Sequence, residues 1–395
     1  MKNPFLGFVV FGFCVLVLYS IGLSDLYPQL TLSTILFLLV MLSINTLFFL
    51  LTNNKICRLS RDIRLIQVRD VPIYVIVGLS ILITIDFLYA GSIPAFDVFR
   101  ESFNRRIKVE FIPVLHIALV VISIFLSQYS IHLYFLRKRR LYIYIVICFG
   151  VIYPLLLAGR GILFVNILAG IIAILFHVDI KLKASKLLKY LVLLFFLSYS
   201  FGKLGEVRST NIRLGSSFDS DTNVIEQISQ PSDLYYSLGL NHNLLWPYIY
   251  IISPLGNFDN MVNDEINFDS DVAYYISSNF VPEFLHKYIG TVREKDKSNL
   301  VVDYFNTYTA FGMPYQQLGW IGVYIYSIFT SLLFYFLISI SSCRLSSIIM
   351  VQFISVGHVF SWFSNLYIKE IVVGPILIGF FILFISSITK SIKRE

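Results

Sequence analysis

The chain has 395 residues, of which 57% are hydrophobic and 14% are charged, and its formal net charge is +7. A soluble domain carries about 25% charged residues, so the apolar surface here exceeds what one soluble core can bury. This composition excludes an ordinary soluble protein and predicts a polytopic membrane protein. The apolar runs are long and continuous, which favours membrane-spanning helices over the alternating strands of a barrel.

About ten segments are long and apolar enough to span a bilayer, which takes roughly 20 residues in a helix. In chain order they are 5–22, 30–51, 72–90, 112–135, 141–158, 162–177, 187–202, 318–340, 345–363 and 371–388. The first follows Met1-Lys2 and lacks a small-residue cleavage site, so we expect a retained span rather than a signal peptide. The predicted fold class is an all-α polytopic membrane protein with about ten transmembrane helices and one large outward loop.

Lysine and arginine concentrate in short loops on the cytoplasmic side of membrane proteins. Here the basic residues gather on alternate connections, in 52–71, 137–140, 181–186 and the tail after 388. This alternation predicts that both termini lie in the cytoplasm. One predicted outward loop, 91–111, breaks the rule because it holds four cations: Arg100, Arg105, Arg106 and Lys108. Either these cations have a function or the loop hides a further span.

The segment 203–317 is too long for a simple connection and differs in charge from the rest. It holds seven basic and fourteen acidic residues, which leaves a net charge of +14 elsewhere in the chain. We therefore expect a large outward loop between an N-terminal bundle of about seven spans, 1–202, and about three C-terminal spans with a cytoplasmic tail, 318–395. The apolar patches 244–255 and 272–281 predict short helices that fold this loop into a cap.

Arg160 lies between two predicted spans with almost no loop, in Gly159-Arg160-Gly161. A guanidinium at the outer membrane boundary is costly and tends to be functional, although snorkelling to lipid phosphates is the alternative. Arg208 and Arg213 follow the predicted seventh span on the same face. With Arg160 they could form a cationic pocket, because arginine binds phosphate oxygens through a fixed fork of donors. Ordinary solvation of the loop is the competing explanation.

Few residues are candidates for a general base. His242 in the outward loop and Asp86 near the outer end of the third predicted span could accept a proton, and so could His286 and His358. A structural role is the alternative for each. The chain has no HExxH sequence, nucleotide-binding glycine loop or cysteine cluster, so we expect no metal, no cofactor and no nucleic acid.

Aromatic residues cluster in the outward loop beside asparagine and glutamine: Trp246, Tyr248, Tyr250, Tyr304, Tyr308 and Tyr315. Aromatic faces with neighbouring amides suit carbohydrate, whose rings present apolar C–H faces and hydroxyl edges. The predicted glycan-binding residues are Trp246, Tyr250, Tyr308 and Tyr315. Burial in the loop's own core explains these rings equally well.

Several short segments resemble the Wzy-type O-antigen polymerases, which polymerise the oligosaccharide repeat units of bacterial envelopes. These segments are Gly91–Phe96, Ala158–Gly161, Trp246–Tyr250, Ser253–Phe258, Asn306–Phe311 and Gln317–Gly322. The likeness extends to the topology of the whole chain. The family often carries an acidic residue before the glycine of the last segment, where this chain has Gln317.

The resemblance implies a glycosyltransferase, similar to class C, in the bacterial inner membrane with its large loop in the periplasm. Such an enzyme transfers the growing glycan from undecaprenyl pyrophosphate to a new lipid-linked repeat and uses no cofactor. The residues that would bind the pyrophosphate are Arg160, Arg208, Arg213, Arg100, Arg105 and Arg106. The first three would also act in catalysis, by stabilising charge on the leaving group. The candidate bases are His242 and Asp86.

The expected partners are the lipid-linked repeats, membrane lipid, a chain-length regulator and a flippase. Other functions stay open at this stage. An O-antigen ligase would use the same donor and transfer the glycan to lipid A core. A transporter or flippase needs polar or broken helices at mid-membrane, where only His358 is evident, and leaves the long loop unexplained. A membrane acyltransferase has no motif to support it.

Overall fold

The computed structural model describes residues 2–66, 68, 70–96, 110–178, 195–196, 198–200, 202–203, 223–264, 268, 271–289, 300–302 and 304–392. The regular elements within these residues are helices. The only strand-like pairing in this part of the chain is an isolated bridge between Ser24 and Pro231. The predicted all-α class is therefore confirmed.

The helices follow one another along the whole described chain. The first half forms α1 (Pro4–Ile21), α2 (Leu32–Asp62), η1 (Ile63–Leu65), α3 (Ile73–Ala90), α5 (Pro113–Arg137), α6 (Leu141–Ile145), η2 (Val146–Ile152), α7 (Tyr153–Leu156) and α8 (Arg160–His177). The second half forms α10 (Val224–Ser229), α11 (Asp233–Ser237), η3 (His242–Leu244), α12 (Leu245–Asn263), α13 (Val272–Phe280), α14 (Glu283–Ile289), α15 (Gly312–Ile340), α16 (Leu345–Phe360), η4 (Leu366–Ile368) and α17 (Glu370–Ile392). Of the elements marked η, η2 is a π-helix and the others are short 3-10 helices.

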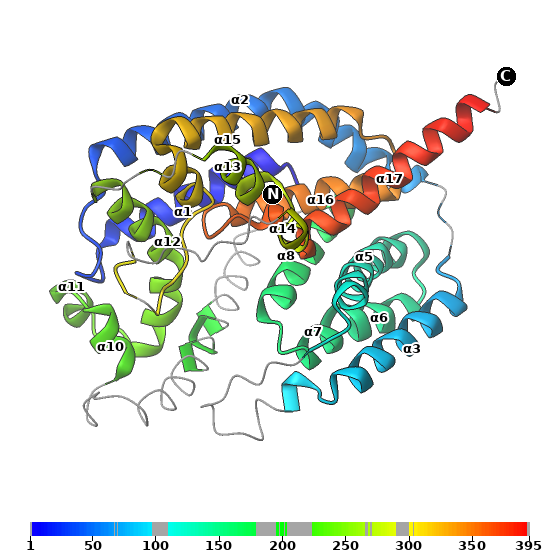
Figure 1. The fold of residues 1–395 in the computed structure, drawn as a ribbon, viewed down its shortest axis with the longest axis horizontal. Helices are drawn as coiled ribbons and strands as arrows, with labels where there is room; N and C mark the ends of the chain where they lie inside the picture. The colour runs from blue at the N-terminus through cyan, green and yellow to red at the C-terminus, as the bar shows by residue number, and fades with distance from the viewer. Residues whose placement is uncertain are drawn as a thin grey trace.

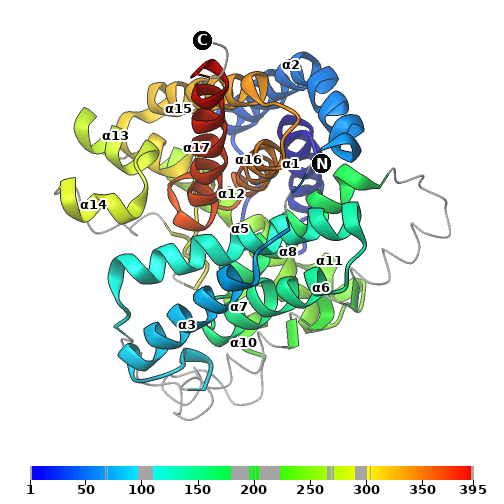
Figure 2. The ribbon, with the colours of Figure 1, turned by 90° about the vertical axis from the view of Figure 1, so that its right-hand side faces the viewer.

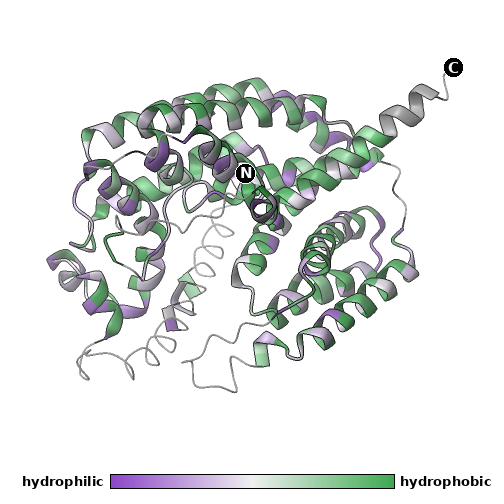
Figure 3. Cartoon of the chain, in the orientation of Figure 1, coloured by the Kyte–Doolittle hydropathy of each residue, from purple (hydrophilic) through white to green (hydrophobic). Residues whose placement is uncertain are grey.

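Within the described residues, five helices are long and apolar enough to cross a membrane, namely α1, α2 with η1, α3, α5 and α15. Shorter apolar stretches accompany them at Leu141–Leu156, Gly161–His177, Leu345–Phe360 and Glu370–Ile385. Figure 3 shows α2, α3 and α15 as mostly apolar, and their outer surfaces expose large side chains, which suits lipid rather than water. A membrane-embedded helical protein is thus supported. The predicted span 187–202 lies largely outside the described residues.

Two helices begin or end away from their predicted limits. α2 continues to Asp62 because no glycine or proline interrupts it, so basic residues expected in a loop form its last turns. α15 begins at Gly312, well before the predicted start at 318. It bends at Leu318 and Gly319, where Gly319 has a φ of +58°, a left-handed conformation that glycine adopts readily. The predicted start of this span therefore coincides with a kink inside a longer helix.

The helices pack around two hydrophobic clusters (Figures 1 and 2). α5, η2, α8, α16 and α17 surround the first, whereas α1, α2, α12 and α15 surround the second. α16 lies at the centre and packs on α1, α8 and α17, and its residues from Leu345 to Val359 are all buried. α3 packs on α5 at the edge of the bundle.

Helix α12 of the large loop belongs to the second cluster. The ring of its Phe258 contacts the ring of Phe37 on α2, with centroids 5.9 Å apart. Its Gly256 faces the ring of Tyr27, and a β-carbon there would lie 2.2 Å from Cδ1. Helices α12 and α13 lie at the two apolar patches of the loop, and α12 extends beyond its patch to Asn263. This helix of the loop therefore shares a hydrophobic core with α1, α2 and α15.

A buried connection joins α16 to α17. Trp362 in this connection is fully buried, and its Nε1 donates a hydrogen bond to the Phe8 carbonyl at 3.1 Å. The Ser361 carbonyl accepts a hydrogen bond from the Ala310 amide at 2.8 Å. The polypeptide after α16 is therefore fixed to both α1 and the end of the large loop.

We expect Gly12→Val to destabilise the protein, because a β-carbon at Gly12 would lie 2.0 Å from Cζ2 of the buried Trp362. Overpacking of this kind costs about 1–3 kcal/mol. Thermal unfolding of the purified protein in detergent measures the effect. Gly78→Val on α3 is the matched control, since no atom lies within 4 Å of its added β-carbon. Equal unfolding temperatures for the two variants would contradict this packing.

Candidate functional site

A buried carboxylate–histidine pair joins the end of α3 to the start of α5. Asp86 Oδ2 lies 2.7 Å from His116 Nδ1, and Asp86 Oδ1 accepts a hydrogen bond from the Ile112 amide at 3.2 Å. The two side chains are 3% and 23% exposed, respectively. Pro113 opens α5, and its ring favours the first position of a helix. The carboxylate therefore lies beside the N-terminal end of α5, where the helix dipole stabilises negative charge.

This pair has the geometry of a base that is oriented by a carboxylate. An ionised carboxylate only accepts hydrogen bonds, so His116 Nδ1 carries a hydrogen and donates it to Asp86. In the neutral ring the other nitrogen, Nε2, then holds a lone pair. Nε2 makes no hydrogen bond or ion pair within the described residues, and the ring is partly exposed. Asp86 fixes the tautomer and can stabilise the imidazolium that forms when Nε2 takes up a proton.

Aromatic rings form a wall beside this pair. Phe111 stacks on the His116 ring, with centroids 4.0 Å apart and an interplanar angle of 16°. Phe87 contacts both Phe111 and Tyr153, with centroid distances of 6.0 and 6.1 Å. The Tyr153 hydroxyl is buried and has no hydrogen-bond partner among the residues that the structure describes. The hydroxyl is therefore an enclosed polar group of the wall that no described residue satisfies.

Arg160 follows this wall along the chain. Tyr153 opens α7, and a turn of three residues, 157–159, leads to Arg160 at the first position of α8. The Gly159 amide donates to the Pro154 carbonyl at 3.0 Å, and Ala158 has a φ of +51°, so the turn is tight. The short connection expected here is confirmed. Of Arg160 itself, the structure describes the main chain.

The other predicted phosphate-binding arginines lie outside the described residues. They are Arg100, Arg105 and Arg106 before α5, and Arg208 and Arg213 after α8. The first group belongs to the segment 97–109, which connects α3 to α5, and the second belongs to the segment that connects α8 to α10. The cationic pocket expected from the sequence stays a prediction.

The other candidate bases lie in different surroundings. His358 is buried in α16, where Nδ1 lies 2.6 Å from the Tyr367 hydroxyl and Nε2 lies 2.6 Å from Asn45 Oδ1. His286 Nε2 contacts the Val281 carbonyl at 2.9 Å. His242 is half-buried in η3. Across the described ranges, no group of three or more His, Cys, Asp or Glu side chains could hold a metal ion.

The predicted glycan-binding aromatics differ in exposure. Trp246 and Tyr250 stack on α12 with centroids 6.2 Å apart, and Tyr250 is 37% exposed whereas Trp246 is buried. Tyr315 is buried against Phe258, and Tyr308 is half-buried. Of these four, Tyr250 therefore offers the largest share of its surface to a ligand, and burial in a core accounts for Tyr315.

The aromatic group and the Asp86–His116 pair lie on different parts of the bundle. α12 packs on α1, α10 and α15, whereas α8 packs on α5, α7 and α16. Figure 1 shows α10 and α12 on the left and α7 and α8 near the lower centre. The described residues therefore do not bring Tyr250 into contact with the pair.

Gln317, which stands where the resemblance leads one to expect an acid, has a buried structural role. Its Oε1 accepts a hydrogen bond from Asn279 Nδ2 at 2.6 Å, and its Nε2 donates to Ser278 Oγ at 2.7 Å. The side chain thus uses both halves of its amide. A carboxylate could not donate the second of these hydrogen bonds.

We expect Gln317→Glu to lower the free energy of unfolding by about 1–3 kcal/mol, because it buries a carboxylate and removes a donor. Thermal unfolding of the purified protein measures the change, and glycan elongation, the activity that the resemblance implies, is assayed beside it. Gln316→Glu, at the half-buried neighbouring position, is the control. A Gln317→Glu protein that is as stable as this control and more active would instead show that an acid acts in catalysis there.

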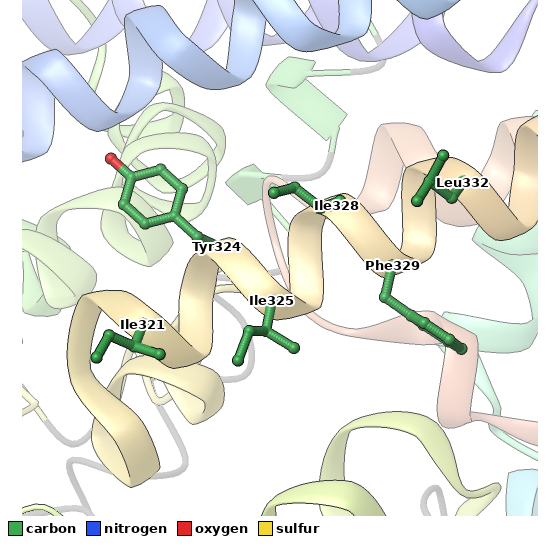
Figure 4. Close-up of a pocket in the computed structure, with 6 residues that line it drawn as sticks. All are labelled: Ile321, Tyr324, Ile325, Ile328, Phe329 and Leu332. Atoms are coloured by element: carbon green, nitrogen blue, oxygen red, sulfur yellow. The ribbon is translucent and has the colours of Figure 1, made fainter.

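An apolar groove of about 500 Å³ runs along α15 on its outer side. Figure 4 shows the side chains that line it, all from this helix: Ile321, Tyr324, Ile325, Ile328, Phe329 and Leu332. Phe329 also contacts Phe280 of α13, with ring centroids 4.9 Å apart. Such a surface can hold hydrocarbon chains, and the Tyr324 hydroxyl is the polar side-chain group among its lining residues.

Sequence reasoning missed His116, Phe111 and Tyr153. One signal could have revealed His116, because Asp86 lies one turn before the end of its predicted span and His116 one turn after the start of the next. A hairpin of two such spans brings both residues to the same level. Comparisons of the chain with protein-family models, with curated proteins and with solved structures give no match.

Proposed function

We propose that this chain is a glycosyltransferase of the bacterial inner membrane that polymerises lipid-linked oligosaccharide repeats on the periplasmic face. The donor is the growing glycan on undecaprenyl pyrophosphate, and the acceptor is a new lipid-linked repeat. The sequence resemblance to Wzy-type polymerases supports this substrate class. The observation that supports the chemistry is the Asp86–His116 pair. It lies beside the aromatic wall of Phe111, Phe87 and Tyr153, and Arg160 follows Tyr153 closely along the chain.

In the proposed reaction, His116 Nε2 takes the proton of the acceptor hydroxyl while its oxygen attacks the anomeric carbon of the donor. The bond between that carbon and the pyrophosphate oxygen breaks, and the lipid pyrophosphate leaves with the electron pair. Arg160 and the other arginine candidates stabilise the charge on the leaving group. Asp86 stabilises the imidazolium until the proton passes to solvent.

The partners follow from this reaction. A flippase supplies lipid-linked repeats to the periplasmic face, and a chain-length regulator limits the number of transfers. The Tyr250 surface on the large loop is available to the glycan, which extends away from the membrane as it grows. No cofactor takes part, because both reactants carry the groups that the transfer needs.

The test is incubation of the purified protein with its lipid-linked repeat in liposomes, read as a ladder of glycans on a gel. Growth of the ladder supports the polymerase. Transfer to lipid A core without a ladder would assign the ligase alternative. Movement of the repeat across proteoliposomes without elongation would assign the transporter alternative, and no reaction at all would contradict the proposal.

A further inference from the structure

A polar pocket of about 340 Å³ lies at the other end of α8 from Arg160. It opens between the start of α1, the end of α2 and the end of α8, on the side predicted to face the cytoplasm. The residues that line it are Lys2, Cys57, Ser60, Arg61, Arg64, Phe176 and His177. Three of these are cations and none is a carboxylate.

The pocket cations differ from other basic residues on the same side of the bundle. Arg58 pairs with Asp62 at 3.7 Å, and Arg137 and Arg139 pair with Asp70 at 2.7 and 3.1 Å. The three pocket cations, in contrast, form no ion pair with any residue in the described part of the chain. Three like charges around one pocket repel one another, so a bound anion would stabilise them.

Hydrogen bonds hold two of these cations in place. Lys2 Nζ donates to Ser60 Oγ at 2.9 Å, and Ser60 Oγ in turn donates to the Phe176 carbonyl at 3.0 Å. Arg64 Nη2 donates to the His177 carbonyl at 3.3 Å. These contacts also satisfy two carbonyls at the end of α8, which would otherwise disfavour an anion. An ammonium has three donors and a guanidinium five, so both groups keep donors for a ligand.

A buried row of hydrogen bonds fixes the tautomer of His177. Gln352 Nε2 donates to Gln128 Oε1 at 2.7 Å and to the Ala169 carbonyl at 2.6 Å. Its Oε1 therefore accepts from His132 Nε2, 3.0 Å away. His132 Nδ1 then accepts, in the neutral ring, from His177 Nε2 at 2.8 Å. His177 thus carries its hydrogen on Nε2 and a lone pair on Nδ1.

Further hydrogen bonds inside the bundle fix the donor–acceptor order of this row. Gln128 Nε2 donates to the Asn166 carbonyl at 3.1 Å, and Asn166 Nδ2 donates to the Gly150 carbonyl at 3.0 Å. Gly150 lies in the π-helix η2, whose altered hydrogen-bond spacing presents that carbonyl to a side chain. Reversing one member would break several bonds at once. The row of hydrogen bonds therefore keeps neutral His177 in the tautomer that has its lone pair on Nδ1.

We propose that this pocket binds a phosphate group that can keep a hydroxyl, as inorganic phosphate and phosphate monoesters do. Lys2, Arg61 and Arg64 donate to the phosphate oxygens, and His177 Nδ1 accepts the hydrogen of the phosphate hydroxyl. The second pKa of a phosphate monoester is about 6, so this protonated form is accessible near neutral pH. Sulfate and phosphate diesters lack that hydrogen and leave Nδ1 unpaired. The source of this group is either inorganic phosphate or a lipid headgroup that is a monoester, such as phosphatidate, and the site does not depend on the proposed glycan transfer.

Calorimetric titration of the full-length protein in detergent tests this site, with inorganic phosphate as the probe and sulfate as the comparison. Nanodiscs that contain phosphatidate or phosphatidylglycerol test the lipid source through the unfolding temperature. We expect phosphate to bind about tenfold or more tightly than sulfate, because sulfate leaves a polar atom unpaired. Arg61→Gln should weaken binding by about tenfold or more. Arg58→Gln, one turn earlier on α2 and paired with Asp62, should leave it unchanged.

Each outcome decides the question. Loss of phosphate binding in Arg61→Gln alone supports the site with free phosphate as a ligand. Stabilisation by phosphatidate but not by phosphatidylglycerol, again lost in Arg61→Gln, supports it with a lipid headgroup as the ligand. Equal binding of phosphate and sulfate, an equal loss in Arg58→Gln, or no response to any probe would overturn the proposal.

Discussion

His116→Ala should slow glycan elongation by about a hundredfold to ten-thousandfold, the range that loss of a general base produces. The variant removes Nε2, which is the lone pair in the Asp86–His116 pair that can take a proton from an acceptor hydroxyl. Because a base acts on the bound acceptor, kcat should fall and the KM for the lipid-linked repeat should change little. The rate of ladder growth with purified protein measures both quantities.

Asp86→Asn tests the orienting role of the carboxylate separately. The amide can still contact the His116 ring, but it lacks the negative charge that stabilises the imidazolium. We expect a decrease in kcat of about tenfold or more. His286→Ala is the matched control, since its ring contacts only the Val281 carbonyl among the polar groups described and belongs to no such pair.

A structural role for His116 would give different results. Added imidazole should partly restore elongation by His116→Ala if the ring acts as a base, because the small molecule can occupy the vacated space. An unfolding temperature close to that of the native protein completes the control, and elongation at the native rate by a folded His116→Ala protein would contradict its role as the base.

The long helices could be predicted from the sequence because their signal is local. An apolar run of sufficient length specifies a helix in lipid whatever its neighbours, and α1, α3 and α5 begin and end within a few residues of the predicted limits. The limits of α2 and α15 could not be predicted in the same way. Hydropathy does not show that the basic stretch after residue 51 continues helix α2. Nor does it show that Gly319 lies at a bend inside α15 instead of at its start.

The candidate site was harder to predict from the sequence than the long helices, because it depends more on tertiary packing. Arg160 was recognisable because its signal, an arginine between glycines and between two apolar runs, is local. The role of His116 arises only when α3 and α5 pack at a register that places it against Asp86. The aromatic residues show the same limit, since their composition predicts a sugar-binding surface, whereas the packing of α12 and α15 decides that Tyr250 is exposed and Tyr315 is buried.

Arg160→Ala should abolish long glycan chains and leave the lipid-linked single repeat in their place. Negative charge develops on the pyrophosphate oxygen as its bond to the anomeric carbon breaks. An arginine at the start of α8 would stabilise this charge, and loss of one such donor costs about a hundredfold or more in rate. Arg160→Lys keeps the charge but loses the bidentate fork, so we expect partial activity with shorter chains. Gel ladders from cells that lack the native protein measure chain length.

The matched control is Arg58→Ala, which removes an arginine from the end of α2, far along the chain from the proposed reaction and 81% exposed in its side chain. This variant should produce normal ladders at equal expression in the membrane. Because Arg160 opens α8 directly after a tight turn, its substitution also requires an unfolding measurement to separate misfolding from lost chemistry. Normal ladders from a well-expressed Arg160→Ala protein would show that Arg160 has no role in the mechanism. Another residue would then have to stabilise the charge on the leaving pyrophosphate while His116 acts as the base.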